Sequence, residues 1–264
     1  MAYLTLNGVT VKVAVGSVSL SYVGIGGEQE RGPNGGLEGG PAVLKREWRM
    51  TTTPIPATEL DAWVGLIEGK GHYWPFDSDL YSTRGRPNSS GTATIVTSSP
   101  TPKWGAGLAR LPAASTISFS TQLPSSPAAW TTLHWRYDTS VSGWRHHVNR
   151  SDGARWLTGV RNDSFAGGLS VTNGAVVLSS ASGLTDFDGL VALPYAVPDS
   201  WPPLFYTQHN SAAWSALPRV LAAGTFAPSS VTVRGQVTGT KVLRGSNAGA
   251  LTTLYTLDFS LREV

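Results

Sequence analysis

The run Leu4-Thr5-Leu6-Asn7-Gly8-Val9-Thr10-Val11-Lys12-Val13 decides the fold class. Apolar and polar residues alternate on both sides of Asn-Gly, which is the pattern of a strand with one buried face. Asn-Gly favours a two-residue hairpin turn, because both central residues of that turn adopt positive φ. The run therefore predicts two short antiparallel strands.

The same alternation continues along the rest of the chain. It returns in five further segments, residues 15–23, 43–52, 231–237, 241–244 and 251–261. Glycine and proline occur 30 and 17 times, and both residues favour turns between short strands over long helices. The chain is therefore predicted to be mainly β.

One segment has the spacing of a helix instead. Thr58 precedes the segment as a cap and Gly69 ends it, so we predict a single helix over about residues 57–68. Its apolar positions are Leu60, Trp63, Val64 and Ile67. The aromatic segment that follows, residues 71–77, is expected to pack a strand edge against this helix.

The middle of the chain resembles a β-sandwich in its spacing. Roughly eight to ten short strand-like runs, separated by Gly, Asp and Ser turns, lie between residues 103 and 194. They include residues 116–120, 131–137, 144–150, 155–158, 169–171, 176–179 and 190–193.

Strand groups at both ends of the chain flank this sandwich, which indicates an insertion. Residues 1–85 and 203–264 are predicted to form one domain, a split β-barrel or sandwich with the single helix. Residues 86–202 are predicted to form the inserted β-sandwich, of jelly-roll, lectin-like type. The last strands need partners, and the N-terminal strands are too few to close a sheet alone. Two consecutive domains are the alternative.

The composition excludes several classes of protein. There is no cysteine, so disulfides, thiolate catalysis, thiolate-bound zinc and iron–sulfur clusters are absent. The net charge of +3 is small and scattered, so we expect no nucleic acid binding.

No apolar stretch approaches the ~20 residues that span a bilayer, and the N-terminus lacks a signal-peptide pattern. We therefore expect no membrane insertion and no cleaved export signal. The 14% of charged residues suits a surface that is partly hidden in an assembly.

Residues 24–40 form a candidate assembly loop. They hold eight glycines and are too polar to bury, and loops of this length are commonly functional. We expect this loop to reach a neighbouring copy of the chain. The candidate contact residues are Gly24, Gly26, Glu28, Glu30 and Arg31.

Residues 1–85 resemble the N-terminal part of the distal tail proteins of tailed bacteriophages. The resemblance rests on the opening Leu6-Asn7-Gly8 hairpin, the glycine-rich loop, a strand with Arg46 and Trp48, the single helix, and an aromatic-Phe-Asp segment before Leu80-Tyr81. It implies a domain that forms a six-membered ring at the end of the tail. Tail tube proteins share the same core.

The middle stretch resembles concanavalin-like or laminin-G-like sandwiches. Residues 103–108 (KWGAGL) match an entry strand, and residues 144–147 (WRHH) with 151–153 (SDG) and Gly159 match a core hairpin. Residues 186–190 (DFDGL) resemble a strand near the end of such domains. The resemblance implies contact with host-surface glycans, and it raises calcium as a cofactor.

Two polar groups are candidate sites of chemistry. His146 and His147 are adjacent on a predicted strand and so point to opposite faces, which makes them poor ligands for one metal ion. We expect one to be packed and one exposed. Asp186 and Asp188 share a strand face, but calcium needs six to eight oxygen ligands and only Asp163 lies nearby in sequence. We therefore assign no metal, cofactor or catalytic residue.

The tryptophans of the middle stretch are the remaining signal for ligand binding. An exposed indole ring can stack on a sugar, whereas a buried one fills a core. We expect most of them to be core residues, and Trp130, which lies among Pro and Ser turns, to be the exposed candidate for glycan contact. These tryptophans are Trp104, Trp130, Trp135, Trp144 and Trp156.

These observations favour a non-enzymatic structural protein. The expected function is that of a subunit of a homo-hexameric ring in a phage tail tip or baseplate. The ring would join the tail tube to tip or hub proteins. The protein is expected to be made in the host cytoplasm and to reside in the virion. An autonomous carbohydrate-binding module and a tail tube subunit are the alternatives. A glycan hydrolase is disfavoured because residues 86–202 contain no Glu for the pair of carboxylates that such enzymes use.

Overall fold

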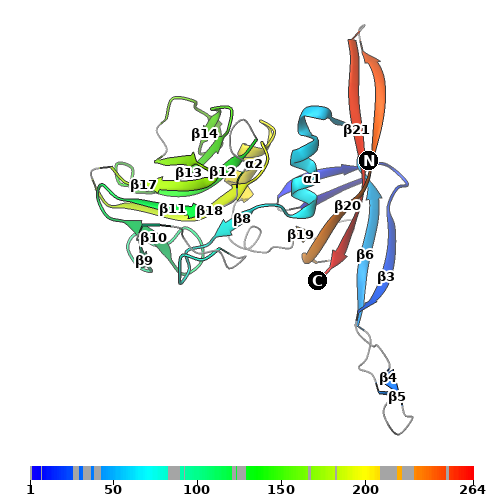
Figure 1. Cartoon of the computed structure of the whole chain (residues 1–264), viewed down its shortest axis with the longest axis horizontal. Coiled ribbons are helices and arrows are strands. Elements are labelled where there is room, and N and C mark those ends of the chain that lie inside the picture. Colours follow the sequence, from blue (N-terminus) through cyan, green and yellow to red (C-terminus); the bar gives the residue numbers. More distant parts are fainter. Residues whose placement is uncertain are drawn as a thin grey trace. The chain divides into compact units, whose positions relative to one another are not determined.

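The computed structural model describes most of the chain, and the part it describes is mainly β, as predicted (Figure 1). Its strands form antiparallel sheets, accompanied by two α-helices. The described residues are 2–6, 8–25, 30–31, 37–38, 43–82, 90–91, 93–120, 123, 129–165, 168–181, 183–208, 219–221, 229–247 and 250–264.

The chain divides into two compact units. The first unit contains residues 1–6, 10–60 and 218–264, and the second contains residues 7–9 and 61–217. The first unit is thus assembled from both ends of the chain, because strands near the two termini pair with one another.

The first unit is built on one eight-stranded sheet. Its strands run in the order β2-β1-β19-β20-β21-β6-β3, and β7 pairs with β21. The strands are β1 (Ala2–Leu6), β2 (Val9–Val13), β3 (Ser19–Ile25), β6 (Val43–Thr51), β7 (Ile55–Pro56), β19 (Arg219–Leu221), β20 (Val231–Asn247) and β21 (Ala250–Glu263).

The predicted hairpin at the N-terminus is present as β1 and β2, with Gly8 at a φ of +83° in the turn. The sheet then curves back on itself at the far end of β2. Val13 forms an antiparallel bridge with Thr52, and the N–H of Ala14 donates to the carbonyl of Thr51 at 2.9 Å. These bonds join the first strand of the sheet to the end of β6.

The core of the first unit follows directly from the alternation of the sequence. In β2 every second side chain is buried, and at the end of β21 Leu257, Phe259 and Leu261 are buried while the polar residues between them are less so. Together with residues of β1, β6 and β20 they form the core, whose buried apolar members include Leu4, Leu6, Val9, Val11, Val13, Trp48, Met50, Val233, Leu257, Phe259 and Leu261.

The second unit contains two sheets. The larger runs in the order β15-β14-β13-β12-β18-β10-β9 with β8 paired to β18, and the smaller runs β11-β17-β16. The strands are β8 (His72–Trp74), β9 (Thr94–Val96), β10 (Leu108–Leu111), β11 (Thr116–Ser120), β12 (Thr131–Asp138), β13 (Gly143–Arg150), β14 (Arg155–Leu157), β15 (Val160–Arg161), β16 (Leu169–Thr172), β17 (Ala175–Ser179) and β18 (Thr185–Leu193).

An apolar core lies between these two sheets. β10 and β18 supply one side of it, and β11 and β17 supply the other. Its buried members are Trp74, Phe76, Ala109, Leu111, Ile117, Phe119, Leu123, Val176, Leu178, Phe187, Leu190 and Ala192. This is the sandwich that the spacing of short strands predicted.

The prediction of a single helix was wrong. The expected helix is present as a 3₁₀ turn (Ala57–Glu59) followed by α1 (Leu60–Glu68), but a second helix, α2, covers Trp201–Gln208. Pro202 and Pro203 lie in its first turn. Proline has no N–H group, and in the first turn this costs no hydrogen bond, because the N–H groups there have no acceptor within the helix. No helix in the described ranges is long and apolar enough to span a membrane.

The compact units differ from the expected domains at both boundaries. We expected divisions at residues 85/86 and 202/203, whereas the units divide at 60/61 and 217/218. The aromatic strand β8 pairs with β18 of the sandwich, and Trp74 and Phe76 lie in the sandwich core. Helix α1 also packs within the second unit, where the ring of Trp63 meets that of Trp201 at 5.0 Å.

Candidate functional site

The expected assembly loop is only partly within the described residues. Gly24 extends β3, where it pairs with Leu44, so it is strand and not loop. Glu30 and Arg31 form the short strand β4 (Glu30–Arg31), which pairs with β5 (Leu37–Glu38). Gly26 and Glu28 lie outside the described residues.

The first unit has a long open strand edge on β20. This strand pairs with β21 along its length, from Val233 opposite Glu263 to Asn247 opposite Ala250. On its other side β20 pairs with β19 only over Val231–Val233. Within the described part of the chain, residues 234–247 therefore have one strand neighbour instead of two, over about 45 Å at the usual rise of a strand.

A second open edge lies at the other end of the strand order. β3 pairs with β6 and has no second neighbour in the described sheet. Leu20 and Tyr22 share one face of β3 and are 51% and 64% exposed, and Ser19 and Ser21 on the other face are exposed as well. Val242 on β20 is similarly exposed, at 55%. Apolar side chains along both open edges are thus accessible to a partner.

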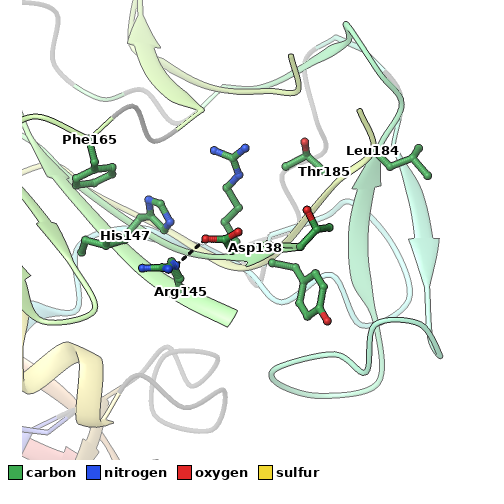
Figure 2. Close-up of a pocket in the computed structure, with 10 residues that line it drawn as sticks. Asp138, Arg145, His147, Phe165, Leu184 and Thr185 are labelled. Carbon is green, nitrogen blue, oxygen red and sulfur yellow. Dashed lines mark ion pairs between the residues drawn. The ribbon is translucent and has the colours of Figure 1, made fainter. Parts of the chain in front are cut away.

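The second unit carries a polar pocket of about 390 Å³. Its floor belongs to β12 and β13, the part of the large sheet that contributes nothing to the apolar core described above. Figure 2 shows Phe165 and His147 at one side and Leu184 and Thr185 at the other. The lining residues are Arg136, Tyr137, Asp138, Thr139, Arg145, His147, Leu157, Phe165, Leu184 and Thr185.

Strand geometry explains why these side chains gather. Arg136 lies directly opposite Arg145 across the β12–β13 ladder, and paired residues share one face of the sheet. Asp138 and His147 are two residues away on the same strands and therefore face the same way. The pocket is thus a polar surface on one face of a sheet whose other regions are apolar.

The charges in the pocket do not cancel. Arg145 Nε lies 2.7 Å from Asp138 Oδ2, so these two charges compensate each other. Ser140 donates from its hydroxyl and its N–H to Asp138 Oδ1, and these bonds with the nearby Arg145 lower the pKa of Asp138. Arg136 has no acidic partner among the described residues, although its guanidinium lies beside Gly168. One positive charge therefore remains.

His147 is buried at the edge of the pocket, with 5% of its surface exposed. Its ring stacks on that of His134 at 5.0 Å and meets Phe165 edge-on at 5.0 Å. Burial, and then the charges of Arg136 and Arg145, lower the pKa of His147 to about 4. The ring is therefore neutral at pH 7, and its Nδ1 has no hydrogen-bond partner among the described residues.

The expectation that one of the two adjacent histidines is exposed was wrong. His146 is fully buried on the opposite face of β13, where its ring lies 4.9 Å from Trp135. Both rings are buried because each face of this strand is covered by aromatic side chains. The two faces were predicted correctly, and in the described chain no group of three or more His, Asp or Glu residues is placed to hold a metal ion.

Asp186 and Asp188 have separate structural roles. Both oxygens of Asp186 accept hydrogen bonds from the guanidinium of Arg110, at 2.7 and 2.9 Å. Asp188 is fully buried and accepts from the backbone N–H of Trp104, within the KWGAGL segment. Burial raises the pKa of Asp188 to about 7, against the opposing effect of its backbone hydrogen bonds. The third aspartate considered with them, Asp163, accepts from the N–H of Arg155 and pairs with Arg161.

The tryptophans lie mostly in packed positions. Trp135 and Trp156 are buried, and Trp144 donates from its indole to the carbonyl of Thr101 at 3.0 Å. Trp130, the candidate for glycan contact, is half-buried and packs against the sandwich core. It is therefore less available for stacking than expected.

Arg136, Asp138 and Arg145 were not predicted from the sequence to form a site. The available signal was a strand in which His134, Arg136 and Asp138 alternate with apolar residues at a position inside the sandwich. A polar face on such a strand needs partners or solvent, and here it lines a pocket.

Comparison with known proteins does not assign the chain to a family. No family model matches the sequence, and no curated protein matches it significantly.

Proposed function

We propose that this chain is a structural, non-enzymatic subunit of a phage tail tip that assembles into a homo-hexameric ring. The ring would join the tail tube to tip or hub proteins in the virion, as the resemblance of residues 1–85 to distal tail proteins implies. The observation that carries the assembly is the open edge of β20, which is long enough for a neighbouring strand to pair with it.

Unpaired strand edges favour association with another strand. The N–H and C=O groups along such an edge lack strand partners, and proteins usually cover the edge, shorten it or place charges on it. β20 is long, and it carries the charged residues Arg234, Lys241 and Arg244. Its pairing with β21 also has a register shift between Val237 and Gly239. Both features limit pairing at the open edge to a strand of matching shape. These features support a specific partner over indiscriminate aggregation.

The two open edges of the first unit belong to different strands. If β20 of one copy pairs with β3 of the next, the contact is heterologous, and a heterologous contact that closes on itself produces a ring. Exposed Tyr22 on β3 and Val242 on β20 would then become buried between copies. The sandwich of the second unit supplies neither of these two edges, and we assign contact with the host to it.

Negative-stain electron microscopy of the purified protein, with mass measurement by light scattering, tests this function. We expect closed six-fold rings. Rings that stack into tubes would favour the tail tube alternative, and a protein that stays monomeric at all accessible concentrations would contradict ring assembly.

Matched variants test the two edges. Val242→Glu and Tyr22→Glu each place a charge on one edge, so each variant alone is expected to be monomeric. Mixing them leaves one intact β20 edge and one intact β3 edge, and we expect dimers that cannot close. Val160→Glu is the control, since Val160 is 69% exposed in the second unit, and this variant should retain rings.

A further inference from the structure

The pocket on β12 and β13 has a feature that packing does not explain. Arg136 is half-buried with its guanidinium at the pocket wall, and no carboxylate of the described residues lies within ion-pair distance of it. Its cross-strand neighbour Arg145 is already compensated by Asp138 at 2.7 Å. A partly buried, uncompensated arginine is costly unless an anion completes its hydrogen bonds.

A second polar group in the pocket also lacks a partner. The side chain of His147 is buried, with 5% exposure, and its ring points toward the middle of the pocket (Figure 2). The Nδ1 atom of this ring has no hydrogen-bond partner among the described residues. Thr185 lines the opposite wall with a hydroxyl, and it too is nearly buried, with 6% exposure. Buried polar groups of this kind are normally hydrogen-bonded, either within the protein or to a ligand.

We propose that this pocket binds a sugar acid, that is, a hydroxylated ring bearing one carboxylate, with the carboxylate on the guanidinium of Arg136. His147, Asp138 and Thr185 would bond the hydroxyl groups, and the ring of Phe165 would cover one apolar face of the ligand. The inference does not depend on ring assembly by the first unit, because all of these residues belong to the second.

The charge of the pocket selects a carboxylate over a phosphate. Only one positive charge is left after Arg145 and Asp138 compensate each other, and one guanidinium binds one carboxylate in a two-pronged arrangement. A phosphate dianion would need a second cation, and the pocket instead presents the Asp138 carboxylate, which repels it. His147 supplies no second charge because its ring is neutral at pH 7.

The size and polarity of the pocket select a hydroxylated ligand over a small aliphatic acid. The volume of about 390 Å³ falls in the range of ordinary small-molecule sites and exceeds the needs of acetate. The walls present an acceptor at Asp138, a hydroxyl at Thr185 and an imidazole at His147, which match the alternating donors and acceptors of sugar hydroxyls.

Titration of the full-length protein with glucuronate, followed by calorimetry or by NMR shifts, tests the proposal. Glucose, acetate and inorganic phosphate at the same ionic strength are the comparison ligands. We expect glucuronate to bind about ten- to a hundred-fold more tightly than glucose, which lacks the charged hydrogen bonds. Acetate and phosphate should both bind more weakly than glucuronate.

Two substitutions assign the binding to this pocket. Arg136→Gln should reduce the affinity for glucuronate to that for glucose, and Arg136→Lys should give an intermediate value because it keeps the charge and loses the planar fork. Arg161→Gln is the matched control, since Arg161 is 50% exposed and pairs with Asp163 and Asp199 outside the pocket. Circular dichroism of each variant establishes that it is folded.

Four results would overturn the inference. Equal affinity for glucose and glucuronate would remove the role of the carboxylate. Unchanged glucuronate affinity in folded Arg136→Gln and Arg136→Lys would place the site elsewhere. Tighter binding of phosphate than of glucuronate, or no binding of any of the four ligands, would exclude a sugar acid as the ligand.

Discussion

Asp188 accepts a 2.9 Å hydrogen bond from the backbone N–H of Trp104, which lies 84 residues earlier in the chain. The bond ties the KWGAGL segment to the centre of β18, and the carboxylate is fully buried. A buried carboxylate is stabilised in its protonated form, which is why its pKa rises to about 7.

This relationship predicts a pH dependence of stability. The folded-state pKa of Asp188 is raised above the value of 3.8 expected for the unfolded chain, so its favourable contribution is complete below pH 3.8 and is lost as the pH rises through about 7. Between pH 4 and pH 7 the free energy of unfolding of the wild-type protein should fall by on the order of 2–4 kcal/mol relative to that of Asp188→Asn. Urea unfolding of both proteins across this range measures the difference. The control Asp79→Asn, at an exposed carboxylate, should run parallel to wild type, and parallel curves for Asp188→Asn would contradict the prediction.

Gly65 on α1 is packed too closely for a side chain. A Cβ atom at this position would lie 2.2 Å from Cε1 of the buried Tyr195. Gly65→Ala should therefore lower the free energy of unfolding by about 1–3 kcal/mol, although alanine is the better helix former. Thermal unfolding measures this. Gly183→Ala is the control, because its Cβ would meet nothing within 4 Å, and equal melting temperatures of the two variants would argue against the close contact.

The ion pair between Arg110 and Asp186 should contribute strongly to the sandwich. Its two hydrogen bonds join β10 to β18, and the Asp186 side chain is only 9% exposed. Arg110→Met leaves this carboxylate without its partner and should cost about 2–3 kcal/mol of unfolding free energy. The exposed pair of Lys70 and Glu68 serves for comparison, and Lys70→Met should change stability by no more than about 0.5 kcal/mol. Similar losses in both variants would contradict this ranking.

The pair of Arg46 and Glu263 predicts a pH dependence of the opposite sign in the first unit. The hydrogen bonds from Arg46 lower the pKa of Glu263 from 4.5 to about 2. Because the folded-state pKa is depressed, this contribution is present above pH 4.5 and is lost as the pH falls through about 2. Solvent reaches both side chains, so the loss should be no more than about 1 kcal/mol. Comparing the acid unfolding of wild type and Glu263→Gln measures it, and identical acid transitions would show that the pair contributes nothing.

Much of the fold was predictable because strand alternation is a local property. The run 116–120 was predicted at the bounds that β11 has, and the predicted runs 131–137 and 144–150 differ from β12 and β13 by one residue at one end. The second helix was missed although Trp201, Leu204 and Phe205 have helical spacing. Two consecutive prolines argue against a helix unless they occupy its first turn, as Pro202 and Pro203 do here. The exposed position expected for one of the two histidines was wrong, because burial depends on what covers a strand face.

The candidate sites were less accessible to sequence reasoning. The loop at residues 24–40 and Trp130 were selected for composition and local turns, which carry no information on neighbouring strands. The open edge of β20 depends on how little of it β19 covers, and the pocket depends on Arg136 and Arg145 being opposite each other across a ladder. Both features depend on the register and extent of a strand pairing, which the alternation within a single strand does not set.

The sequence by itself determined the class of structure, the positions of most strands, and which side chains of each strand lie on one face. A period of two residues is sufficient for this, since neighbouring side chains of a strand point in opposite directions. The tertiary structure alone decided that β8 joined β18 in the sandwich, and it set the order in which strands from the two ends of the chain lie side by side in one sheet. Strand pairing uses backbone groups that every residue carries, so the choice of partner depends on how the apolar faces pack together in the whole fold.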